Sequence, residues 1–262
     1  MSPNFVTLAL PSGGQLAGDY DPPADPGTGF IVVWVHGFGS HRGGEKAAAV
    51  RQECRRRGWG FAAFDFRGHG GSSGEMHELR ASGLLADLAA IRHFLAARGH
   101  TRLGLVGSSM GGFAAGWFAR DHPADVVGCV LLAPAFAFLA RRWDRLTPDE
   151  REQWRRTDRL PIRTDWVEAE LGYGLIEERE QFRVADLAAG WLIPTLLFHG
   201  WADDVVPAAD SLEFLRQVDN PRVELRLFKD GDHRLTAYKD EIAAEAGRFF
   251  ARLLAESKSQ TL

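Results

Sequence analysis

From residue 30 onward, short apolar runs alternate with longer segments in which apolar and polar positions are mixed. The apolar runs have the length of strands buried on both faces, and the mixed segments are helix-like. The predicted strands are Phe30–Val35, Gly60–Phe66, Leu103–Val106, Val126–Leu132, Thr195–Phe198 and Val223–Phe228. The predicted helices are Glu45–Arg57, Leu84–Arg98, Gly112–Arg120, Ser211–Val218 and Lys239–Glu256. This alternation predicts an α/β fold, with a mostly parallel sheet covered by helices on both faces.

The first thirty residues have a different pattern. Two strand-like runs, Asn4–Leu10 and Gln15–Asp19, are separated by the turn-forming sequence Pro11-Ser12-Gly13-Gly14, which predicts an antiparallel hairpin at the N-terminus. No flexible or proline-rich linker divides the remaining chain, and 45% hydrophobic residues are enough for one large core. We therefore expect residues 1–262 to form a single domain.

Residues 136–185 form an insertion that is too long for a single crossover helix, and we expect a lid, or cap, over the carboxyl edge of the sheet. The capping box Thr147-Pro148-Asp149-Glu150 predicts a helix that runs to about Thr157. The stretch Trp166–Gly174 fits a strand or a helix. Trp143 and Trp166 are possible substrate-binding residues, although packing of the lid explains them equally well. The arginines of this segment alternate with acidic residues, which favours a solvated helix face over an anion-binding surface.

Charge and terminal composition exclude several classes of function. The 31 basic and 35 acidic residues give a net charge of −4, without the basic surplus of a nucleic-acid-binding protein. Residues 1–5 lack the pattern of a signal peptide, and the longest apolar run, Val126–Ala140, is too short to span a bilayer. We therefore expect a cytoplasmic protein with no integral membrane segment; the sequence leaves its oligomeric state open.

The segment Gly107-Ser108-Ser109-Met110-Gly111 directly follows one apolar run and leads into a helix-like stretch rich in small residues. This context is typical of a nucleophile elbow, a turn whose strained backbone lifts a serine hydroxyl clear of the sheet. Gly107 and Gly111 leave room for the helix to pack against the neighbouring strands. Ser109 is therefore the predicted nucleophile.

The same short pattern occurs a second time, in Gly70-Gly71-Ser72-Ser73-Gly74. Here three residues separate the pattern from the preceding strand, and no small-residue helix follows. We therefore interpret Ser72 as part of a glycine-rich loop.

Two further polar groups follow predicted strands. Asp203 comes after the strand Thr195–Phe198, and His233 comes after Val223–Phe228. Ligands of such sheets bind at the carboxyl ends of the strands, and the order Ser, Asp, His is that of α/β-hydrolases. We predict that His233 acts as the base for Ser109 and that Asp203 orients His233, with Asp204 as the main rival for the acid role.

The sequence His36-Gly37-Phe38-Gly39 follows the strand Phe30–Val35, where an oxyanion loop belongs. The backbone N–H groups of Phe38 and Met110 are the predicted oxyanion-hole donors. His36 and Gly37 are predicted to shape the site, with the His36 ring bracing the loop. No histidines and cysteines have the spacing of zinc ligands, so we expect no metal and no cofactor.

Together these motifs resemble the α/β-hydrolase superfamily along essentially the whole chain. The matching segments are His36-Gly37, Arg67-Gly68-His69-Gly70, the elbow at Ser109, the acid turn at Asp203 and Gly231-Asp232-His233. A narrower set resembles the mitochondrial α/β-hydrolase-domain depalmitoylases and their bacterial relatives: Gly37-Phe38-Gly39-Ser40, Gly44-Glu45-Lys46-Ala47, Gly107 to Gly112 and Asp232-His233-Arg234. That resemblance implies cleavage of acyl thioesters and acyl-glucuronide esters.

The leading hypothesis is a serine esterase or thioesterase that acts on a small-molecule acyl ester or thioester through an acyl-enzyme at Ser109. An aryl or cinnamoyl-type carboxylesterase shares every one of these residues, and C–C bond hydrolases and perhydrolases use the same triad. A non-catalytic ligand receptor on the same fold is the remote alternative, since such receptors usually lack a triad member.

Overall fold

The computed structural model describes residues 4–11, 13–163 and 167–259. Its main sheet has eight strands in the order β1-β2-β4-β3-β5-β6-β9-β10. These are β1 Phe5–Ala9, β2 Gln15–Asp21, β3 Phe30–Val35, β4 Gly60–Phe64, β5 Arg102–Ser108, β6 Val126–Leu132, β9 Thr195–Gly200 and β10 Val223–Phe228. In this sheet order, the six strands from β4 to β10 are all parallel, as the apolar runs predict.

The predicted N-terminal hairpin is present and joins the edge of the sheet. β1 pairs antiparallel with β2, and β2 pairs antiparallel with β4. The second strand is longer than its apolar run, because Tyr20 and Asp21 pair with Ala62 and Phe61 of β4. The polar ends of strands thus depend on their neighbours in the sheet more than on their own composition.

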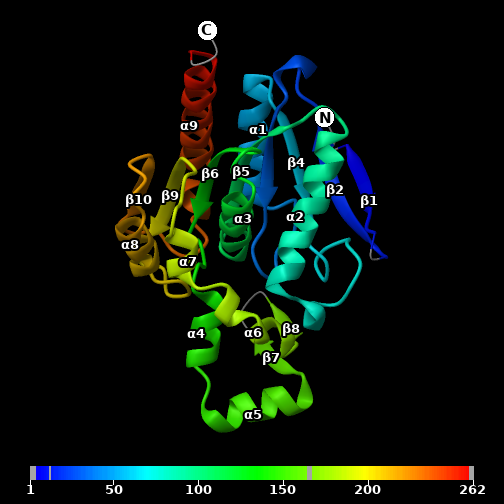
Figure 1. Ribbon diagram of the computed structural model, residues 1–262, viewed down its shortest axis with the longest axis vertical. Coiled ribbons are helices and arrows are strands. Elements are labelled where there is room, and N and C mark those ends of the chain that lie inside the picture. Colours follow the sequence, from blue (N-terminus) through cyan, green and yellow to red (C-terminus); the bar gives the residue numbers. More distant parts are fainter. Residues whose placement is uncertain (1–3, 12, 164–166, 260–262) are drawn as a thin grey trace.

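Helices cover both faces of the sheet (Figure 1). The long helices on the two faces are α1 Glu45–Arg57, α2 Ala81–Ala96, α3 Met110–Asp121, α8 Ala208–Gln217 and α9 Lys239–Ser259. Residues of α1 and α9 share one buried apolar cluster, and residues of α2, α3 and α8 share the other. No helix among the described residues has the length and apolar character needed to cross a membrane.

Between β6 and β9 the chain leaves the sheet and forms a separate layer at one end of it (Figure 1). This layer contains α4 Phe138–Asp144, α5 Pro148–Thr157, β7 Leu160–Arg163, β8 Glu168–Leu171 and α6 Gly174–Glu177, and the chain then returns to the sheet through α7 Val184–Ala188, which packs against α3 and α8. We refer to residues 136–185 as the lid, keeping the boundaries set by the sequence. Four single 3₁₀ turns complete the described structure: Pro26–Thr28, Met76–Glu78, Arg179–Gln181 and Thr236–Tyr238.

The capping box at Thr147 forms as predicted. The hydroxyl of Thr147 accepts a hydrogen bond from the N–H of Glu150, and Oε2 of Glu150 accepts one from the N–H of Thr147 over 2.8 Å. The helix ends at Thr157. In the stretch for which the sequence left strand or helix open, residues 168–171 form β8, which pairs antiparallel with β7. The indole N–H of the buried Trp154 donates to the carbonyl of Leu171 over 2.8 Å and ties α5 to this hairpin.

Candidate active site

Ser109 occupies a sharp turn between β5 and α3. Its backbone has φ 54° and ψ −117°, a conformation that non-glycine residues rarely adopt and that is found at functional sites. A Cβ on Gly107 would lie 2.5 Å from the carbonyl oxygen of Gly111, and a Cβ on Gly111 would lie 2.1 Å from that of Val35. The two glycines therefore permit the close packing of helix on strand that puts Ser109 at the edge of the sheet.

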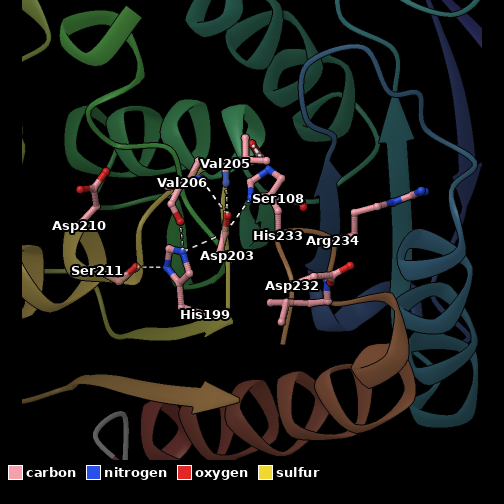
Figure 2. A network of polar contacts seen from close by, with 12 residues as sticks. Ser108, His199, Asp203, Val205, Val206, Asp210, Ser211, Asp232, His233 and Arg234 are labelled. Carbon is pink, nitrogen blue, oxygen red and sulfur yellow. Dashed lines mark hydrogen bonds and ion pairs between the residues drawn. The ribbon is translucent and has the colours of Figure 1, made fainter. Parts of the chain in front are cut away.

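The structure brings Ser109, His233 and Asp203 into one chain of hydrogen bonds. Nε2 of His233 lies 3.1 Å from Oγ of Ser109, and Nδ1 of His233 lies 2.8 Å from Oδ2 of Asp203. The three residues follow β5, β10 and β9, so the parallel sheet assembles them from positions far apart in sequence. Figure 2 shows His233 beside Asp203.

The two neighbouring carboxylates take other positions. Asp204 is exposed. Oδ1 of Asp232 accepts the N–H of Leu235 over 2.8 Å and so closes its own loop. Asp203 is therefore the carboxylate that contacts the His233 ring in this structure.

Asp203 is held by donors on both of its oxygens. Oδ1 accepts the N–H groups of Val205 and Val206 over 2.9 and 2.8 Å, and Oδ2 contacts His233 and also Nε2 of His199 at 3.2 Å. Burial alone would raise the pKa of Asp203, but the hydrogen bonds from His199 and His233 outweigh it and hold that pKa well below its usual range. The carboxylate is therefore ionised at neutral pH.

His199 is a part of the site that sequence reasoning missed. Its Nε2 also lies 2.9 Å from the carbonyl oxygen of Val206, which can only accept, so Nε2 carries the proton; Nδ1 then accepts from the hydroxyl of Ser211 over 2.8 Å. This buried ring fixes the turn that presents Asp203 (Figure 2). The sequence did contain one signal for His199, its position directly after the predicted strand Thr195–Phe198, which leads into the turn at Asp203.

Phe38 and Met110 line the same cavity as Ser109. Within the described part of the chain, no hydrogen bond uses the backbone N–H of either residue. These two donors are thus available for a substrate oxygen, as an oxyanion hole requires. Their assignment to that role stays a prediction.

His36 lies fully buried beneath the loop that carries Gly37 and Phe38. Its Nε2 accepts the N–H of Phe66 over 3.0 Å, and its Nδ1 donates to the carbonyl of Gly37 over 2.8 Å. Burial, followed by the nearby His69, lowers the pKa of His36 to about 4, so the ring is neutral at physiological pH. This geometry fits the bracing role predicted for His36.

Ser72, the serine of the second glycine-rich pattern, lies within a loop. Its hydroxyl accepts the N–H of Ala17 over 2.9 Å and donates to the carbonyl of Asp65 over 2.5 Å. Both bonds fasten the loop to the edge of the sheet, as expected for a structural serine.

A cavity of about 140 Å³ opens beside Ser109, between the sheet and the lid. Its walls are mainly apolar, with charged side chains contributed by the lid and by α8. The apolar residues are Phe38, Met110, Ala135, Phe138, Leu171, Leu175, Val205 and Val206, and the charged ones are Arg141, Arg142, Arg145 and Asp210.

The lid arginines fall into two groups. On the lid surface, Arg155 and Arg159 pair with Glu152 and Glu170, as the solvated-face interpretation predicts. Another three line the cavity: Arg141, which contacts Asp210 at 2.5 Å, and then Arg142 and Arg145. Arg141 and Arg142 are half-buried on α4, so the solvated-face interpretation does not hold for them, whereas Arg145, directly after α4, lines the cavity and is also exposed to solvent.

Arg142 and Arg145 form a positively charged pair in the cavity wall. Burial lowers the pKa of Arg142, and the charge of Arg145 lowers it further. Within the described ranges, no carboxylate lies within ion-pair distance of either guanidinium. The wall beside Ser109 thus carries positive charge that the protein itself leaves unneutralised.

Trp143 belongs to the interior of the lid and is absent from the cavity wall. The guanidinium groups of Arg151 and Arg179 lie 4.6 and 4.5 Å from its ring centroid, and the ring of Tyr173 packs against its edge. Its predicted contact with substrate remains untested. Trp166 lies outside the described residues.

Across residues 4–11, 13–163 and 167–259, no group of three or more His, Cys, Asp or Glu side chains is placed to hold a metal ion.

Comparison with known proteins gives a consistent result. A family model described as serine aminopeptidase, S33, matches residues 28–149. The bovine mitochondrial palmitoyl-protein thioesterase ABHD10 is 27% identical over 212 residues, which are 80% of this chain and 68% of that protein.

Two solved structures show the likeness in three dimensions. Mouse α/β-hydrolase domain-containing protein 10 superposes with a TM-score of 0.84 at 24% identity and covers 95% of this chain and 99% of that one. Est1E from Butyrivibrio proteoclasticus, solved with ferulic acid bound, gives a TM-score of 0.83 at 21% identity and the same coverage. The family model and the bovine relative support a hydrolase, and the two solved structures show the fold. The chain has the α/β-hydrolase fold and resembles the ABHD10 palmitoyl-protein thioesterases and bacterial esterases.

Proposed function

We propose that this protein is a serine hydrolase that cleaves carboxylic esters or acyl thioesters through an acyl-enzyme at Ser109. The observation that carries the proposal is the hydrogen-bonded chain from Ser109 through His233 to Asp203, which opens into a cavity beside two free backbone donors. The similarity to thioesterases and esterases supports the same chemistry.

The geometry suggests the course of the reaction. Nε2 of His233 takes the hydroxyl proton while Oγ of Ser109 bonds to the substrate carbonyl carbon, and Asp203 stabilises the imidazolium. The N–H groups of Phe38 and Met110 donate to the tetrahedral oxyanion. The C–O or C–S bond then breaks, and the imidazolium protonates the departing alcohol or thiol. Water, activated by the same imidazole, attacks the acyl-enzyme and releases the carboxylic acid.

The size of the cavity favours a second, narrower candidate, an aryl or short-chain carboxylesterase. An engineered cavity of about 150 Å³ in an unrelated protein is filled by benzene. The cavity beside Ser109, at about 140 Å³, is therefore of a size that fits an aryl or short acyl group. A long acyl chain needs the lid to move or must extend past it.

A substrate panel tests both proposals. We would measure kcat/KM for matched oxygen esters and thioesters of increasing acyl length, together with aryl esters, using Ser109→Ala as the blank. A maximum at short or aryl oxygen esters supports the carboxylesterase, and a rise toward long thioesters supports a depalmitoylase-like activity. Rates equal to the blank for every substrate contradict a serine hydrolase and favour a receptor.

A further inference from the structure

A lysine outside the Ser109–His233–Asp203 chain connects the two loops that carry the nucleophile and the base. Lys46 is the second residue of α1, the helix that follows the predicted oxyanion loop. Its Nζ donates to Oγ of Ser108 over 2.9 Å and to the carbonyl oxygen of Arg234 over 2.6 Å. Ser108 directly precedes Ser109, and Arg234 directly follows His233.

The surroundings of the Lys46 ammonium group disfavour its positive charge. Burial lowers the pKa of Lys46 to about 8; the positive charge of Arg234 also lowers it, while Asp232 and Asp203 act in the opposite direction. In the described part of the chain no carboxylate lies within ion-pair distance of Nζ. Lys46 is partly exposed, and its ammonium group bonds to a hydroxyl and a carbonyl, contacts that contribute little to the stability of the fold. Stability of the fold alone therefore does not account for Lys46.

The neighbouring lysine shows the contrast. Lys239 begins α9 and pairs with Glu45, the residue before Lys46, at the surface. Exposed pairs of this kind contribute little to stability. Lys239 thus contacts the residue next to Lys46 in sequence, whereas Lys46 itself bonds to Ser108 and Arg234.

We propose that Lys46 is a positioning residue that sets the distance between Ser109 and His233. The inference rests on the proposed function. By bonding to Ser108 and Arg234 at once, Lys46 joins the elbow to the loop of the base and maintains the 3.1 Å separation of Oγ and Nε2. Proton transfer depends steeply on such separations, and a displacement of about 1 Å can lower a rate about 100-fold.

The decisive variant is Lys46→Met, which keeps the length of the side chain and removes its donors. We expect kcat for the preferred ester to fall about 10- to 100-fold. We expect an unchanged KM, because the cavity wall does not include Lys46. The rate at which a fluorophosphonate labels Ser109 falls in parallel, and the melting temperature stays the same or rises. Lys239→Met is the matched control and retains wild-type kcat.

The pH profile separates positioning from a purely structural role. Lys46 faces Arg234 and Asp232 in the loop after β10 and Asp203 after β9, with Glu45 beside it on α1. As pH rises past about 8, Lys46 loses its charge and its hydrogen bonds weaken, so wild-type kcat declines. The Lys46→Met variant lacks this decline.

A second variant, Ser108→Ala, removes one of the two bonds while Lys46 stays in place. We expect a smaller loss of kcat, and the double variant is expected to match Lys46→Met alone, because both changes act on one connection. Losses that multiply, or a Lys46→Met enzyme with wild-type kcat and pH profile, overturn the inference. An inactive wild-type protein that no fluorophosphonate labels contradicts the proposed function instead.

Discussion

Nδ1 of His233 lies 2.8 Å from Oδ2 of Asp203. The next residue, Asp204, is exposed. Replacing Asp203 by asparagine removes the carboxylate that selects the His233 tautomer, and we expect kcat to fall about 10⁴-fold, the loss this substitution causes in Ser-His-Asp proteases. Asp204→Asn is the control and should retain wild-type kcat. A larger loss in the Asp204 variant would transfer the acid role to that residue.

The nucleophile can be separated from its look-alike by two single substitutions. Ser109→Ala removes the attacking oxygen, and we expect turnover to fall by about 10³-fold or more with the fold intact. Ser72→Ala breaks two loop hydrogen bonds and should leave kcat nearly unchanged. Initial rates and melting curves of both variants check this, and equal losses would contradict the assignment of Ser109.

The positive wall of the cavity predicts a preference for substrates that carry a carboxylate. Arg142→Gln and Arg145→Gln should each lower kcat/KM for a hemiglutarate aryl ester more than for the matching butyrate ester. The same preference should weaken with added salt. A comparison of the butyrate esters of phenol and of 4-hydroxybenzoate shows whether the enzyme also prefers a carboxylate on the alcohol part of the substrate. Arg155→Gln, which alters a surface pair, is the control; identical charge preferences in all variants would exclude this role.

The neutral, buried His36 predicts a loss of stability in acid. Its folded pKa of about 4 lies below the usual 6.5, so the unfolded chain binds the proton first as pH falls. Above about pH 6.5 the neutral His36 contributes up to about 3 kcal/mol to the free energy of unfolding. This contribution is lost as the pH falls toward 4.

Urea denaturation at a series of pH values measures this effect. His36→Gln should be less stable at neutral pH and should show a shallower pH dependence than the wild type. The exposed His93, replaced in the same way, should leave the curve unchanged. A wild-type stability that is flat across this pH range would contradict the prediction.

The elbow glycines predict a sharp steric limit. In Gly111→Ala the added methyl would meet the carbonyl oxygen of Val35 at 2.1 Å, and backbone cannot move aside cheaply. We expect a loss of about 3 kcal/mol or more in the free energy of unfolding. Gly83→Ala, in the first turn of α2 with only ordinary contacts, should be neutral or stabilising. Denaturant titration of the two variants gives the comparison.

Much of the sheet and the site could be predicted because both depend on local sequence. The strands Phe30–Val35, Val126–Leu132 and Val223–Phe228 have the predicted bounds. The first two are almost wholly apolar, and in Val223–Phe228 apolar residues are interrupted by Glu224 and Arg226. Ser109, Asp203 and His233 each follow a predicted strand, so the parallel sheet brings them together. Helix α2 begins earlier than predicted, at Ala81, because packing against the sheet recruits residues that carry no strong local signal.

The features that escaped prediction depend on contacts between distant segments. Lys46 reaches Ser108 across 62 residues and Arg234 across 188, and no local pattern records either contact. The short lid elements are stabilised by packing, as the Trp154 bond to Leu171 illustrates. Whether an arginine faces solvent or the cavity likewise depends on how α4 is docked, which composition does not determine.

The lid leaves the sheet after β6 and returns at β9, and these two strands are hydrogen-bonded neighbours. Its entry and exit are therefore adjacent, and the eight-stranded scaffold closes without it. An insertion of different length or composition could be exchanged at this junction without changing the register of the sheet or the position of Ser109. Substrate range and bond-breaking chemistry can thus diversify separately in proteins of this architecture, one by replacement of a module and the other by point substitution at the elbow.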